Sequence, residues 1–138
     1  MKKKIRAALL ALMMVTALGT QAFAAQTARS YDFTFKPPYS GSWRKSSDCY
    51  NPVRGYKPYV SPSTSSARTV YYLLPKEVYD DGDVIPSATN YLTTGAKGKQ
   101  YFTYNSGYGG TGNKYYLAAR PADMNFQNEY RVRGTWAP

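Results

Sequence analysis

The chain of 138 residues predicts an all-β fold, a small antiparallel β-sandwich or partly open barrel of about five to seven strands. Its fifteen tyrosines all follow residue 24, and tyrosine, threonine and valine favour pleated surfaces over helix. Several segments alternate apolar and polar side chains, as a strand with one buried side does. Beyond residue 24, no segment combines apolar residues at helical spacing with helix caps.

The first predicted strand covers residues 30–36 and ends at Pro37. Its aromatic residues share one face and its polar residues share the other: Tyr31, Phe33 and Phe35 against Asp32, Thr34 and Lys36. A second strand over residues 68–74 is apolar almost throughout and ends at Pro75, so we expect a central strand covered on both faces.

The remaining strands follow a predicted turn at Asp80-Asp81-Gly82-Asp83 and a short apolar step, Val84-Ile85, before Pro86. Residues 99–104 and 114–120 are expected to pair with each other across a glycine-rich loop. The last strand covers residues 129–136. It directs Tyr130, Val132 and Trp136 inward and Arg131 and Arg133 outward.

Residues 37–67 form a basic segment rich in proline and serine. Because so long a loop without structure is uncommon in a compact domain, we expect short edge strands around residues 42–44 and 54–59. Residues 61–66 are the predicted true loop.

Residues 1–24 have the three-part order of a secretory signal peptide: a basic start, an apolar run from Ala7 to Leu18, and the small-x-small sequence Ala22-Phe23-Ala24. The apolar run is too short for a bilayer span, which takes roughly 17–25 residues. We expect cleavage after Ala24 and a single secreted domain over residues 25–138, extracellular or loosely associated with the cell surface. An uncleaved N-terminal anchor is the alternative.

The single cysteine, Cys49, excludes an intramolecular disulfide. It lies far beyond the cleavage site, so it is not the acylated cysteine of a lipoprotein. An inert buried thiol, an intermolecular disulfide and a redox-exposed site all remain open.

Charge is concentrated in one part of the chain. Residues 25–138 carry fourteen Lys and Arg against eight Asp and Glu, and the excess lies in residues 36–76, where Asp48 is the only acid. Aromatic residues alternate with the cations there. Cations attract an anionic polymer while rings stack on sugars or lie at a lipid interface. The candidate ligand-binding residues are Trp43, Arg44, Lys45, Arg54, Tyr56, Lys57 and Tyr59.

For an exported protein, the anionic partners are cell-wall polymers such as teichoic acids, acidic polysaccharides and the membrane surface. Nucleic acid would use the same chemistry, but export argues against it, so we expect no nucleic-acid partner. The competing interpretation is that the lysines keep an edge-rich β protein soluble and protect its edges from pairing.

Two motifs suggest ligands that the sequence does not support. Residues 107–112 match the spacing of a dinucleotide-binding loop, but a strand-like segment follows where the phosphates need a helix N-terminus. Asp80, Asp81 and Asp83, with Glu77 nearby, lack the spacing of a calcium-binding EF-hand, although weak calcium binding stays open. We expect no nucleotide, no cofactor and no metal site.

The chain has no histidine, which excludes Ser-His-Asp and Cys-His catalysis and imidazole metal ligands. A glycosidase needs two carboxylates roughly 5–10 Å apart. Asp123 and Glu129 could supply such a pair, but nothing in their spacing favours it. We expect no enzyme activity, with a hydrolase as the remaining alternative.

Four segments of the chain resemble segments of known proteins: residues 31–35, 98–104, 112–117 and 130–136. In these segments the chain resembles an uncharacterised family of small secreted β-rich proteins of Firmicutes, a domain of unknown function. The resemblance covers most of residues 25–138 and implies a secreted β-rich domain of Gram-positive bacteria. More loosely, the chain is similar to the lactococcin-type bacteriocins, with Trp136 as the terminal aromatic residue.

These observations predict a secreted, non-enzymatic β domain that binds anionic cell-envelope polymers or a membrane surface. The alternative is a bacteriocin-like antimicrobial protein or its immunity partner. The identity of the ligand, the oligomeric state and the state of Cys49 are left open by the sequence.

Overall fold

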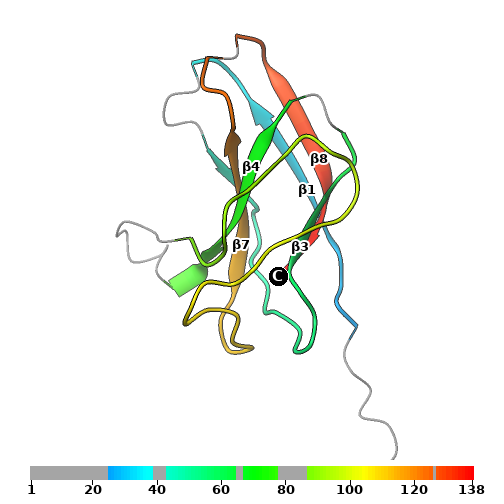
Figure 1. Cartoon of the computed structure of the whole chain (residues 1–138), viewed down its shortest axis with the longest axis vertical. Coiled ribbons are helices and arrows are strands. Elements are labelled where there is room, and N and C mark those ends of the chain that lie inside the picture. The colour runs from blue at the N-terminus through cyan, green and yellow to red at the C-terminus, as the bar shows by residue number, and fades with distance from the viewer. Residues whose placement is uncertain (1–24, 39–42, 65–66, 78–86, 126) are drawn as a thin grey trace, which may run out of the picture.

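The computed structural model describes residues 25–38, 43–64, 67–77, 87–125 and 127–138. In these residues, eight strands form two four-stranded antiparallel sheets (Figure 1). The first sheet has the order β1 (Arg29–Phe35), β8 (Tyr130–Ala137), β3 (Tyr59–Pro62) and β6 (Gln100–Tyr101). The second has the order β2 (Arg44–Lys45), β7 (Tyr115–Pro121), β4 (Thr69–Pro75) and β5 (Leu92–Thr94).

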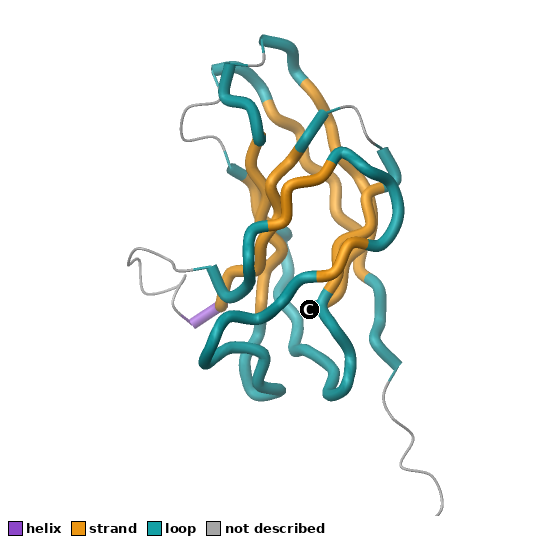
Figure 2. Tube along the Cα trace, in the orientation of Figure 1, coloured by secondary structure: helices purple, strands orange, loops and turns teal. Residues whose placement is uncertain are grey.

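The two sheets bury one common core between them. Aromatic and aliphatic side chains of both sheets belong to this cluster: Tyr31, Phe33, Phe35, Val60, Val132 and Trp136 from the first, and Tyr71, Leu73, Tyr115 and Leu117 from the second. The described residues outside the strands are loops and turns, apart from Lys76 and Glu77, whose backbone is helical (Figure 2). The prediction of an all-β fold is confirmed, and of its two forms the two-sheet sandwich is observed.

β1 and β8 form the longest pair of the first sheet and follow the predicted alternation. Tyr31, Phe33 and Phe35 are buried, and the intervening residues lie on the outer face. Register pairs Phe33 with Val132, so the two inward faces coincide. The inward and outward faces predicted for the last strand are confirmed in the same way.

β4 is the central strand predicted from its continuous apolar sequence. It pairs with β7 on one side and β5 on the other, and six of its seven residues are buried. The outer face is covered because Leu74 packs with Tyr116 and Ala118 of β7 in a second, smaller cluster that includes the partly buried Cys49.

The expected pairing of residues 99–104 with 114–120 is wrong. β6 pairs with β3 in the first sheet, whereas β7 pairs with β2 and β4 in the second. Only two residues of the expected strand are regular, because the buried Phe102 leaves β6 and its N–H bonds to Pro58 O at 2.9 Å. The glycine-rich loop therefore crosses from one sheet to the other.

Several other boundaries also differ from the prediction. The described residues contain eight strands against the predicted five to seven. The additional edge strand, β5, was not predicted because its three residues show no alternation. Of the two edge strands expected in the basic segment, β2 is at an edge, whereas β3 lies between β8 and β6. Residues 54–55, expected to be part of a strand, form a turn. Ser61 and Pro62, predicted to be loop, end β3 instead, where they pair with Thr135 and Gly134. The predicted signal peptide and the turn at residues 80–83 lie outside the described residues.

Candidate functional site

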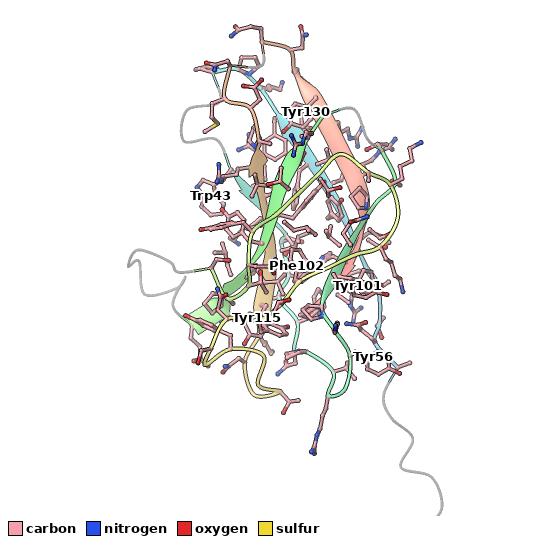
Figure 3. All side chains as sticks on the ribbon, viewed as in Figure 1. Trp43, Tyr56, Tyr101, Phe102, Tyr115 and Tyr130 are labelled. Carbon is pink, nitrogen blue, oxygen red and sulfur yellow. The ribbon has the colours of Figure 1, made fainter. Side chains whose placement is uncertain are left out.

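The seven candidate residues fall in two separate places on the molecule. Trp43 and Tyr56 lie on opposite sides of the sandwich in Figure 3. Trp43 precedes β2, at the edge of the second sheet, and Tyr56 precedes β3 of the first. The basic segment therefore does not form one continuous binding face.

One group belongs to the turn that leads into β3. The N–H of Tyr56 bonds to Val53 O at 3.1 Å, and Gly55 takes a φ of 86°, a left-handed conformation that glycine adopts without steric cost. This turn leaves Arg54, Tyr56 and Lys57 exposed. The ring of Tyr56 is an uncovered aromatic surface next to two cations.

Tyr59 is not an exposed ring, in contrast to the prediction. Its side chain is 4% exposed and lies beneath its neighbours on the outer face of the first sheet. Tyr101 of β6, directly opposite in register, contacts it with ring centres 6.3 Å apart. Lys99 Nζ lies 4.5 Å from the centre of the Tyr59 ring. Tyr59 therefore supports the residues that are exposed above it.

The β3–β6 pairing brings in residues that the sequence reasoning missed. Lys97, Lys99 and Tyr101 are exposed, and the ring of Tyr101 is one of the most exposed aromatic surfaces described. The N–H of Gly98 bonds to Pro62 O at 3.1 Å, which holds this segment against β3. The local alternation of lysine with Tyr101 is a visible signal in the sequence, but residues 99–104 were expected to pair with residues 114–120.

These residues form what we call the basic–aromatic strip, along the edge of the first sheet at β3 and β6. Four cations line it, and none of the acids among the described residues lies in the segments that build it. Figure 3 places Tyr56 and Tyr101 toward the same end of the molecule. The strip consists of Arg54, Tyr56, Lys57, Tyr59, Lys97, Lys99 and Tyr101.

The second group surrounds β2. Arg44 donates from Nη1 to Trp43 O at 2.9 Å, and its guanidinium carbon lies 5.9 Å from the centre of the Phe35 ring. Lys45 Nζ lies 4.1 Å from the centre of the Tyr116 ring. The two cations thus lie on opposite faces of β2, one toward β1 and one over the outer cluster of the second sheet.

An open groove of about 600 Å³ separates β1 from β2. Its lining mixes charges, since Lys36, Arg44 and Lys45 line it together with Asp32 and Asp48. Asp32 is bound by Arg131, whose Nε donates to Asp32 Oδ1 at 2.6 Å, and this hydrogen bond lowers the pKa of the carboxyl. The groove carries less uncompensated positive charge than the strip.

Within the described residues, no three side chains of the Cys, Asp or Glu type are grouped as metal ligands would be. No helix in the same residues has the length and apolarity needed to cross a bilayer. The glycine-rich loop is followed by β7, as expected, so its glycines do not precede a helix.

Comparisons with protein-family models, with curated proteins and with solved structures find no match to this chain.

Proposed function

We propose that the protein is a secreted, non-enzymatic domain that binds anionic polymers of the cell envelope through the basic–aromatic strip. Supporting this, four cations of the strip are exposed in segments that contain no acid among the described residues. No acid in these segments therefore offsets the attraction to a polyanion. In the groove between β1 and β2, Asp32 and Asp48 do offset it.

The rings of the strip suit a sugar-containing polymer. Tyr56 and Tyr101 are 45% and 54% exposed, so each offers a flat apolar surface that can stack on a pyranose or on the carbon chain of a polyol. Lys99 holds its charge above the buried Tyr59, which preorganises the ammonium group instead of leaving it on a free chain. Cation and ring lie two residues apart along each segment, Lys57 with Tyr59 and Lys99 with Tyr101, which is about 6.7 Å in an extended chain.

The test is retention of the purified protein on Gram-positive cell walls, with and without teichoic acid, at two salt concentrations. Retention that needs teichoic acid and falls with salt supports the proposal, because exposed charges are screened by salt. A variant with Arg54, Lys57, Lys97 and Lys99 changed to Gln should lose this retention.

A matched control removes the same charge elsewhere. It changes Lys36, Lys45, Lys114 and Arg120 to Gln, positions outside the strip. Equal losses in the two variants would reduce the effect to net charge and contradict the strip as the site. Vesicles with anionic lipid form a separate arm, and binding to them in place of the walls would contradict a polymer ligand.

A further inference from the structure

β1 is the terminal strand of the first sheet, and its outer edge faces the groove. The sheet order places β8 on one side of β1 and, among the described residues, no strand on the other. The groove is lined by Ser30 through Thr34 of β1 and by Arg44 and Lys45 of β2. A seven-residue edge strand thus lies open beside a channel.

The hydrogen bonds of β8 show which backbone groups of β1 face this channel. Arg133 O accepts from the N–H of Ser63 at 2.8 Å, and the N–H of Arg133 donates to Thr64 Oγ1 at 3.2 Å. Both main-chain groups of Arg133 therefore point away from β1, so its register partner Asp32 belongs to a pair without mutual hydrogen bonds. Asp32, and by alternation Ser30 and Thr34, direct their N–H and C=O groups to the open edge.

The floor of the groove is aromatic and contains one unpaired donor. Tyr31, Phe33, Tyr50 and Trp136 line it, and the ring centres of Tyr50 and Trp136 are 5.9 Å apart. Trp136 Nε1 is buried and has no hydrogen-bond partner among the described residues. Because Trp136 is 0% exposed, this unpaired N–H is a local cost of the fold beneath the groove and not a contact point for a ligand.

We propose that the groove binds an extended peptide segment of a partner protein, which adds to the edge of β1 as a further strand. Its backbone would pair with the free N–H and C=O groups of Ser30, Asp32 and Thr34. Alternate side chains of the added strand would point at the aromatic floor, as in other cases of strand addition.

The position of Arg44 specifies the chemistry of this peptide. Arg44 lines the groove, and its guanidinium carbon lies 5.9 Å from the ring centre of Phe35, a buried residue on the inward side of β1. Asp32 on the outward side is already held by Arg131. An acidic side chain that points inward near Phe35 would therefore meet Arg44. The preferred peptide has an apolar residue with an acidic residue two positions away, so that both side chains point to the same face.

The probe is a capped seven-residue peptide of the order threonine, glutamate, threonine, valine, threonine, glutamate, threonine. It reads the same in both directions and so covers parallel and antiparallel addition. A twin with lysine in place of glutamate is the charge control. We expect saturable binding of the glutamate peptide by calorimetry and slowed hydrogen exchange at the amides of Ser30, Asp32 and Thr34.

Two variants separate strand addition from charge attraction. Thr34→Pro removes one edge-facing N–H without touching the β8 ladder and should weaken binding roughly tenfold, the value of about one hydrogen bond. Thr34→Ala keeps the N–H and should bind more tightly than Thr34→Pro. Arg44→Gln should abolish the preference for the glutamate peptide over its lysine twin while leaving a folded protein.

Three results would overturn the proposal: no saturable binding of either peptide, exchange protection elsewhere than β1, or equal affinities of the Thr34→Pro and Thr34→Ala proteins when both have the parent's circular dichroism. The variants of the basic–aromatic strip keep β1 and β2 intact. Failure of wall binding therefore leaves this test unaffected, and the reverse also holds.

Discussion

Several cations of this protein lie directly on aromatic rings. Lys99 covers Tyr59, Lys45 covers Tyr116, and the guanidinium carbon of Arg29 lies 4.2 Å from the centre of the Tyr50 ring. The aliphatic part of such a side chain shields apolar surface while the charge stays in water. In this way a chain rich in tyrosine can bury its rings near the surface and still present positive charge.

The ion pair between Asp32 and Arg131 predicts a small dependence of stability on pH. The hydrogen bond from Arg131 lowers the pKa of Asp32 below its unfolded value of about 3.9, so its contribution is complete above that pH and is lost as the pH falls through the folded pKa. The difference in urea midpoint between the parent and Asp32→Asn should shrink below about pH 4. It should also shrink in high salt, and a difference that grows in acid would contradict this assignment.

Gly134 is required by the close approach of β3 to β8. A Cβ at this position would lie 2.2 Å from the carbonyl oxygen of Ser61 and 2.9 Å from the Cα of Pro62, both backbone atoms. Gly134→Ala should therefore lower the free energy of unfolding by about 1–3 kcal/mol, measured by urea denaturation. Gly112→Ala is the control, because a Cβ there meets nothing within 4 Å, and equal losses would contradict the packing described.

At the scale of elements, the long strands were predictable and the short ones were not. β1, β4, β7 and β8 each lie within one residue of the predicted bounds, because their alternation or continuous apolar sequence reflects burial that extends over seven or eight residues. β2 and β6 have two residues each, too few to show a period. Their place is fixed by tertiary pairing.

The part of the candidate site that depends on local sequence was predictable, and the part that depends on tertiary pairing was not. Arg54, Tyr56 and Lys57 are close in sequence and were identified by local composition. Lys99 and Tyr101 join them only because β6 pairs with β3, a contact between distant segments. Tyr59 is a candidate ligand-binding ring by composition but is buried in the structure, because composition does not tell which side of a short strand is covered.

The central pair β4–β7 should be the most sensitive element to loss of volume. Leu117 of β7 is fully buried, opposite Leu73 of β4 in the register. Leu117→Ala should cost about 2–5 kcal/mol in the free energy of unfolding, the usual range for a buried leucine. The exposed Thr93→Ala on the edge strand β5 should change it by less than about 0.5 kcal/mol, and a smaller loss at Leu117 than at Thr93 would contradict this packing.

For the whole molecule, a hydroxyl contact links the two sheets inside the core. The hydroxyl oxygens of Tyr31 on β1 and Tyr71 on β4 are 3.3 Å apart and buried. Burial raises the pKa of both hydroxyls, and the neighbouring Tyr71 raises that of Tyr31 further. The packed sheets therefore favour the neutral form of both hydroxyls.

Because the folded pKa values are raised, their stabilising effect is present below the unfolded pKa of about 10 and is lost as the pH rises above it. We expect a set of tyrosines that titrate only with cooperative alkaline unfolding, followed by absorbance at 295 nm together with circular dichroism. Tyr31→Phe with Tyr71→Phe should move this unfolding to higher pH. Titration of all tyrosines before unfolding would contradict the buried pair.

The central claim, that the basic–aromatic strip binds an anionic envelope polymer, is tested most directly by amide chemical shifts during titration with purified teichoic acid. If the strip is the binding site, the largest shifts fall in residues 54–59 and 97–101 and diminish as salt is added. Shifts confined to residues 43–48, or no shifts at low salt, would contradict it.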